Sequence, residues 1–214
     1  MSTVVSLLTL KGGGGKTTLA INLAVRFAHQ GKKVLLIDTD KQHSACSWAG
    51  ERAENKLPIK VIHFPEPAVL QKQLPNYKDY DIILIDGAPA IDSMATASAV
   101  MSDLVIFPVA SSMLDIWAVQ KMMELLESLK LSYPYIKTAI VANKVNTRTN
   151  QAKELNEALQ GIKDHYVFDT QIGHRVAYSD SISEGLGVFE WNDPKAQNEI
   201  TELSQEITKI MEVE

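Results

Sequence analysis

Short runs of apolar residues alternate with helical patterns along almost the whole chain. The runs are rich in β-branched and aliphatic residues, and they are apolar at nearly every position rather than at every second one. This pattern is typical of strands that are buried on both faces of a sheet. Strands are therefore predicted at 4–9, 34–38, 60–63, 82–86, 104–109, 138–142 and 166–168.

Helices are predicted between these strands, at 16–30, 44–55, 93–101, 114–131 and 150–159. A last helix is predicted to begin at Asp193, an N-cap residue followed by Pro194 at the first helical position. Its apolar stripe consists of Ile200, Leu203, Ile207 and Ile210. Strands and helices in this order indicate an α/β fold, a mostly parallel twisted sheet with helices on both faces. At 214 residues, the chain is expected to form one domain over 1–214.

A glycine-rich segment joins the first predicted strand to the first predicted helix. It reads Leu10-Lys11-Gly12-Gly13-Gly14-Gly15-Lys16-Thr17-Thr18. The glycines let successive backbone N–H groups turn toward phosphate oxygens, and the N-terminus of the following helix adds partial positive charge. Lys16 is expected to contact the β- and γ-phosphates, and the Thr17 hydroxyl to coordinate Mg²⁺. The segment therefore predicts a phosphate-binding loop for a triphosphate with magnesium.

Two carboxylates are predicted at the ends of buried strands. Asp38 ends the strand at 34–38 and Asp86 ends the strand at 82–86, which is the side where open α/β sheets bind ligands. Asp86 is expected to meet Mg²⁺ through water, and Gly87 to offer its N–H to the γ-phosphate. Either aspartate taken alone also fits a helix N-cap or a loop acid.

The loop departs from the ordinary phosphate-loop pattern, because Leu10 replaces a glycine and a second lysine, Lys11, stands inside the loop. In this respect it resembles the deviant Walker-A family of P-loop ATPases, which includes ParA partition ATPases and MinD. The segment from Asp38 to Gln42 is similar to that family's D-x-D-P-Q, with Lys41 in place of proline. The similarity extends from Val4 to about Ile210.

This resemblance implies an ATPase that uses ATP and Mg²⁺ and hydrolyses slowly without a partner. It implies that Lys11 reaches the partner's phosphates across a homodimer formed on ATP binding, and that Asp38 orients the attacking water and holds the hydration shell of the metal. It also implies that Asn143 contacts adenine. A solvated Lys11 and a strand-end turn at Asn143 are the alternatives.

The charge of the chain restricts the partners that it can bind. With 26 acidic and 21 basic residues the net charge is −5, so any binding to DNA has to use a local patch. The resemblance implies nonspecific duplex DNA, and the candidate contacts are Lys144, Arg148, Lys153, Lys163 and Arg175. One cysteine, Cys46, excludes an internal disulfide and a cysteine-ligated cluster. The last predicted helix is acidic, so no membrane binding is expected.

The function that follows is a cytoplasmic, nucleoid-associated partition ATPase. It would segregate plasmid or chromosomal DNA and leave its DNA track when an adaptor or centromere-binding protein stimulates hydrolysis. The first alternative is the positioning of a protein organelle such as a carboxysome. The second is a stand-alone metabolic enzyme that uses ATP.

Overall fold

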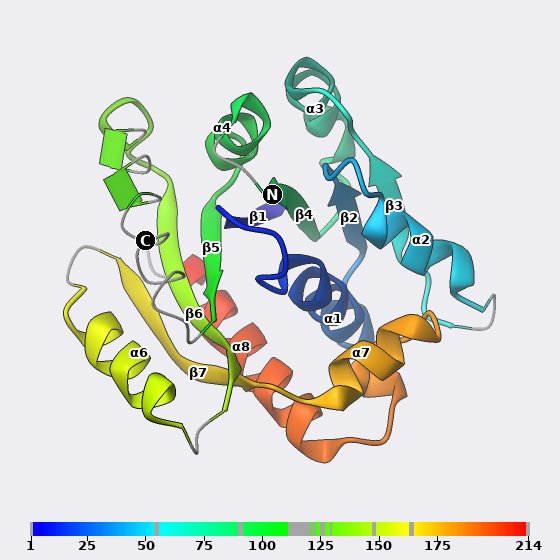
Figure 1. Cartoon of the computed structure of the whole chain (residues 1–214). Coiled ribbons are helices and arrows are strands. Elements are labelled where there is room, and N and C mark those ends of the chain that lie inside the picture. The colour runs from blue at the N-terminus through cyan, green and yellow to red at the C-terminus, as the bar shows by residue number, and fades with distance from the viewer. Residues whose placement is uncertain are drawn as a thin grey trace.

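The structure, a computed structural model, describes residues 2–53, 56–89, 92–110, 121, 123–124, 127–128, 130–146, 149–162 and 165–212. These residues build a seven-stranded sheet in the order β3-β2-β4-β1-β5-β6-β7, and every pairing is parallel (Figure 1). The strands are β1 (Thr3–Thr9), β2 (Val34–Asp38), β3 (Lys60–His63), β4 (Ile82–Pro89), β5 (Leu104–Val109), β6 (Lys137–Val145) and β7 (Tyr166–Gly173). All seven predicted strands are confirmed.

Helices cover both faces of the sheet, as predicted (Figure 1). One face carries α1 (Lys16–His29), α2 (Ser44–Glu51), α7 (Val176–Ser183), the 3₁₀ turn η2 (Val188–Glu190) and α8 (Pro194–Glu212). The other face carries α3 (Pro67–Gln73), η1 (Leu74–Tyr77), α4 (Ser93–Val100) and α6 (Asn150–Gln160). Side chains of β1 alternate between the two cores, with Val5 and Leu7 on the α1 side and Val4 and Leu8 on the opposite side.

Several element boundaries differ from the sequence predictions. The short helices α3 and α7 were not predicted, and β7 runs on to Gly173. Strand β7 lies at the edge of the sheet and alternates buried and more exposed residues, so its second half lacks a continuous apolar run. Of the helix predicted at 114–131, residues 114–120, 122, 125–126 and 129 lie outside the described residues, and the described ones are helical.

Helix α2 ends at Glu51, earlier than the predicted residue 55. The reason is that Arg52 takes an extended backbone conformation and turns its guanidinium onto η2. There it forms a bidentate pair with Glu190, at 2.8 Å and 2.9 Å, and both side chains are less than 10% exposed. Arg52 also donates to the carbonyl oxygens of Leu57 and Gly185. This Arg52–Glu190 clamp ties the end of α2 to the segment before α8.

Helix α8 lies against β7, and two of its glutamates bind that strand. Glu206 accepts the backbone N–H groups of Asp169 and Thr170, each at 2.9 Å, where the pairing of β7 with β6 is irregular. Glu199 accepts the N–H of Gly173 at 3.1 Å. The predicted stripe of α8 is buried in the core at Ile200, Leu203 and Ile207, so these residues have no free apolar face to offer a bilayer.

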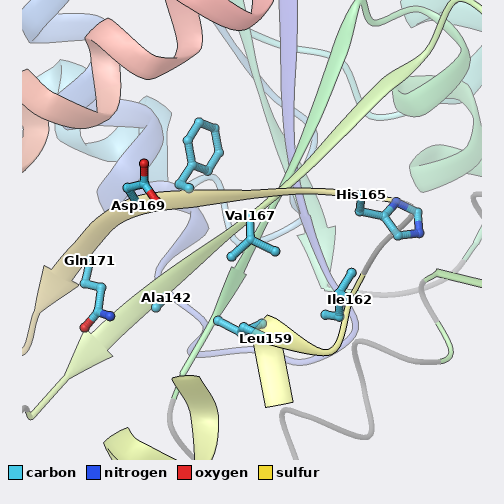
Figure 2. A pocket seen from close by; sticks show the side chains of 8 residues that line it. Ala142, Leu159, Ile162, His165, Val167, Asp169 and Gln171 are labelled. Atoms are coloured by element: carbon cyan, nitrogen blue, oxygen red, sulfur yellow. The ribbon is translucent and has the colours of Figure 1, made fainter. Parts of the chain in front are cut away.

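A cavity of about 370 Å³ lies on the opposite side of β7, between this strand and the end of α6 (Figure 2). Apolar and polar side chains both line it, and Figure 2 shows Ala142, Leu159, Ile162 and Val167 around it, with His165 at one end and Gln171 at the other.

Candidate functional site

The glycine-rich loop lies between β1 and α1, as the sequence predicts. Gly13 and Gly15 have positive φ angles of 80° and 84°, a left-handed conformation that glycine adopts without steric cost. Gly15 is the N-cap of α1 and provides no side-chain cap, so the first N–H groups of the helix are not used by a capping side chain. An anion can take these donors, because the N-terminus of a helix carries partial positive charge.

Lys16 begins α1 and is buried at the base of the loop. It is only 6% exposed, and its ammonium donates a 2.9 Å hydrogen bond to the hydroxyl of Thr9. That hydroxyl in turn donates to the carbonyl oxygen of Lys11 at 2.7 Å. Burial lowers the pKa of Lys16, although the nearby carboxylates of Asp86 and Asp40 act in the opposite direction. Lys16 is thus a desolvated cation held in the loop, whereas Lys11 is exposed.

Asp86 and Thr17 meet below the loop. The Thr17 hydroxyl donates to Oδ2 of Asp86 at 2.6 Å. Oδ1 of Asp86 is buried and has no partner among the described residues, and burial is the main reason that the pKa of this carboxyl rises to about 7. A carboxylate oxygen and a threonine hydroxyl are the oxygen ligands that Mg²⁺ prefers in nucleotide sites. The unpartnered Oδ1 therefore fits a cation, and Thr17 and Asp86 are the residues that would hold it.

Asp38 lies opposite Asp86, because the two residues are paired in the register of β2 and β4. Its carboxylate accepts three backbone N–H groups, from Asp40 at 3.0 Å, Ala45 at 3.0 Å and Cys46 at 3.1 Å. The last two belong to the first turn of α2, so Asp38 caps this helix. A carboxylate has about four acceptor positions. The side chain of Cys46 also hydrogen-bonds to Asp38, which is fully buried, so capping uses most of its acceptor positions. Its role in orienting an attacking water stays a prediction.

Gly87 follows Asp86 where β4 crosses close to β1. A Cβ atom at this position would stand closer than 3.0 Å to Leu8 and to the carbonyl oxygen of Leu7. Only glycine fits this approach. Its contact with a γ-phosphate stays a prediction.

Asn143 lies at the end of β6 and against the loop. It is 3% exposed, its Nδ2 donates to the carbonyl oxygen of Gly14 at 2.8 Å, and its Oδ1 accepts the N–H of Lys144 at 2.9 Å. The loop lies so close that a Cβ on Gly15 would stand within 3.0 Å of Nδ2. The structure thus places Asn143 in the site, and its contact with adenine stays a prediction.

The remaining predicted loop residues surround the same place. Gly12 and Gly13 are exposed, Gly14 is half-buried, and Thr18 accepts a hydrogen bond from Asn22 through its carbonyl oxygen in the first turn of α1. Thr9, which anchors Lys16, was not among the predicted site residues. Its position as the last residue of the strand before the loop was the only signal for it.

The five residues predicted to contact DNA do not form one described patch. Lys144 donates from Nζ to the carbonyl oxygen of Gly13 at 2.7 Å, so its ammonium lies on the loop. Arg175 is paired with Glu199 at 2.6 Å. Lys153 is exposed on α6, and Arg148 and Lys163 lie outside the described residues. The assignment of these residues to DNA stays a prediction.

Within the described part of the chain, no helix is both long and apolar enough to cross a membrane.

Comparisons with known proteins identify a family of nucleotide-binding proteins that this chain resembles. Residues 5–188 match the family model of the CobQ/CobB/MinD/ParA nucleotide binding domain. The maintenance of carboxysome distribution protein A of Halothiobacillus neapolitanus is 27% identical over 209 residues, which cover 94% of either chain. The chromosome-partitioning ATPase Soj of Thermus thermophilus is 27% identical over 212 residues, which cover 85% of either chain.

A solved structure shows that the fold is shared more widely. Cobyrinic acid a,c-diamide synthase from Mycobacterium smegmatis, with a bound ATP analogue and magnesium, has a TM-score of 0.81 at 16% identity and covers all of this chain and 96% of its own. The family match spans most of the sequence and contains the loop, both strand-end aspartates and Asn143. The chain therefore belongs to the CobQ/CobB/MinD/ParA family, among the ParA/MinD-type partition and positioning ATPases.

Proposed function

We propose that this protein hydrolyses ATP with Mg²⁺, forms a homodimer when it binds ATP, and binds duplex DNA without sequence preference in that state. An adaptor that stimulates hydrolysis would release the protein from DNA. Because the protein would bind chromosomal DNA in its ATP state, it would be cytoplasmic and associated with the nucleoid. The observation that carries the proposal is the arrangement of Asp86, Thr17 and Lys16 under the glycine loop. It combines an unpartnered buried carboxylate oxygen, a hydroxyl and a buried ammonium.

Each site residue then has a role in hydrolysis. Mg²⁺, bound with the nucleotide, would neutralise phosphate charge, which is the chief requirement of phosphoryl transfer. Lys16 and the N–H groups of Gly12, Gly13, Gly14 and Gly15 bind the phosphates. Thr17 and Asp86 hold the metal, and Asp38, which lies opposite Asp86 in the paired strands, orients the attacking water. Gly87 offers its N–H to the γ-phosphate.

Lys11 accounts for the homodimer. It is exposed on the loop whereas Lys16 is buried, so Lys16 serves its own site and Lys11 is free to extend toward a second chain. A positive charge supplied by a partner stabilises the transition state, and in related phosphoryl transfers it raises the rate by roughly 10³-fold or more.

The test is the Lys11→Ala variant, measured by gel filtration with a nonhydrolysable ATP analogue and by phosphate release. We expect loss of the ATP-dependent dimer and a fall in turnover of roughly 10³-fold. Lys72→Ala, which removes an exposed lysine on α3, is the control and should match the wild type. An unchanged dimer and unchanged turnover in Lys11→Ala would leave the stand-alone metabolic enzyme as the better interpretation.

DNA binding is tested separately by a gel shift with nonspecific duplex at low salt. ATP-loaded protein should retain the duplex, and retention should fall steeply as salt rises, because phosphate contacts release counterions. No retention of any duplex by the ATP dimer would refute the DNA track.

A second candidate cargo is a protein organelle. The relative that is named for carboxysome distribution covers 94% of this chain, more than the chromosome-partitioning relative covers. A neighbouring gene for a small DNA-binding protein would favour plasmid or chromosome partition. A neighbouring gene for an organelle adaptor would favour carboxysome-like positioning.

A further inference from the structure

The carboxyl end of β6 holds the phosphate-binding loop from one side. Two consecutive residues of this strand, Asn143 and Lys144, donate to two consecutive carbonyl oxygens of the loop. The amide of Asn143 binds the oxygen of Gly14 at 2.8 Å, and the ammonium of Lys144 binds the oxygen of Gly13 at 2.7 Å. The two ties join segments that are about 130 residues apart in the sequence, 129 for one and 131 for the other.

These ties determine where the loop N–H groups point. In a trans peptide, the carbonyl of one residue and the N–H of the next residue point in opposite directions. Holding the carbonyls of Gly13 and Gly14 toward β6 therefore turns the N–H groups of Gly14 and Gly15 away from β6. A loop that binds phosphate needs its N–H groups free of internal carbonyl partners and aligned before the anion arrives.

The backbone of Lys144 is itself in an uncommon conformation. Its φ angle is 55°, in the left-handed region that residues other than glycine seldom adopt. The Oδ1 atom of Asn143 accepts the N–H of Lys144 at 2.9 Å and so stabilises this conformation. Strained residues of this kind cluster at functional sites, where the surrounding structure holds them.

We propose that Lys144 is a positioning residue of the phosphate-binding loop: it ties the Gly13 carbonyl to the end of β6 and thereby aligns the loop for the phosphates of the nucleotide. This inference rests on the proposed function, because it assumes that the loop binds a nucleotide. It gives Lys144 a role in the nucleotide site that does not require DNA.

The experiment compares Lys144→Met, Lys144→Arg and wild type, without DNA, by calorimetric titration with MgADP. Lys144→Met should bind MgADP about tenfold more weakly, because it loses a charge-assisted hydrogen bond that organises the loop. Lys144→Arg keeps a charged donor and should recover most of the affinity. Lys209→Met removes an exposed lysine on α8 and should bind like the wild type.

Two further measurements separate positioning from general stability. The unfolding temperature without nucleotide should be the same in all four proteins, and the KM for ATP should rise in Lys144→Met more than kcat falls. If Lys144→Met is unstable, the MgADP affinities of Lys144→Arg and Lys209→Met are compared instead. A Lys144→Arg variant that binds MgADP tenfold more weakly than Lys209→Met would refute the proposal.

The outcomes distinguish this inference from the proposed function. Equal MgADP affinity in Lys144→Met and wild type would refute the positioning role of Lys144 and leave the proposed function intact. If the same variant also lost DNA binding, Lys144 would belong to a DNA-binding surface. A wild-type protein that binds no MgADP would refute the nucleotide site itself.

Discussion

The Arg52–Glu190 clamp makes a quantitative prediction about stability. Replacing Glu190 by Gln keeps the shape of the side chain but removes its charge, and it leaves the guanidinium of Arg52 buried without a counterion. Both side chains are less than 10% exposed, so water replaces little of the lost interaction. Breaking a buried ion pair on one side costs about 3–5 kcal/mol, and for Glu190→Gln, which can still accept one hydrogen bond, we expect about 3 kcal/mol.

The expected loss is large enough to measure by thermal unfolding. For a chain of 150–250 residues, 1 kcal/mol corresponds to about 2–4 °C, so Glu190→Gln should unfold roughly 6–12 °C below the wild type. Asp79→Asn is the matched control, because Asp79 pairs with Lys33 on the surface, where the side chains are 63% and 53% exposed. Surface pairs contribute little, so this variant should unfold at the wild-type temperature.

A double-mutant cycle with Arg52→Met completes the test. The two changes should not be additive, since removing Arg52 also removes the unpaired charge that makes Glu190→Gln costly. A loss below about 1 kcal/mol for Glu190→Gln, or additive losses in the cycle, would show that the clamp does not stabilise the fold as its geometry implies.

The same pair predicts a dependence on pH. Burial alone would raise the pKa of Glu190, but hydrogen bonds from Arg52 and from the N–H of Gly187 lower it overall. A carboxylate with a lowered folded-state pKa stabilises the protein fully above its ordinary pKa of about 4.3, and this contribution is lost as the pH falls through the folded-state value. The difference in stability between wild type and Glu190→Gln should therefore shrink below about pH 4.3. A difference that stays constant down to pH 3 would contradict this reasoning.

Two further predictions concern the nucleotide site. Asp86→Asn removes the carboxylate whose Oδ1 has no partner among the described residues, so Mg²⁺ should no longer strengthen ADP binding. Titrations of ADP with magnesium and with a chelator measure this effect, and an effect equal to that of the wild type would exclude Asp86 as a ligand. Gly15→Ala should abolish ADP binding, because the added Cβ would collide with Asn143. Gly13→Ala has a similar φ angle but lies in open space, so it should only weaken ADP binding. Equal losses of ADP affinity in the two variants would show that backbone strain, and not the contact with Asn143, causes the loss.

The centre of the sheet, and the placement of the loop and the two strand-end aspartates at one edge of it, could be predicted from the sequence for a common reason. Strands β1, β2, β4 and β5 are buried on both faces, so their apolar character is continuous, and the residues of the loop follow directly from one of them. The acids Asp38 and Asp86 end such strands, and parallel strands bring their ends to one edge. A pattern that is local in the sequence was therefore enough.

The rest depended on contacts between distant segments. Arg52 ends α2 because it pairs with a residue 138 positions away, and nothing near Arg52 indicates this. From the sequence, Lys144 was predicted to be a surface lysine that contacts DNA. Its hydrogen bond to the carbonyl oxygen of Gly13 forms only when β6 lies beside the loop, which the local sequence does not indicate. In the middle of β7, a glutamate of α8 accepts backbone N–H groups where the pairing with β6 is irregular, a contact that the strand itself does not reveal.

Two glutamates of α8 restrict how the protein can assemble. The last strand of a sheet is an open template for another chain, and unprotected templates of this kind lead to polymers by strand addition. Here Glu206 and Glu199 already accept N–H groups along β7, so an incoming strand would have to displace charged acceptors of the protein's own helix. A polymer that extends from the β7 edge should therefore grow through contacts between folded surfaces, and it should dissociate without unfolding its subunits.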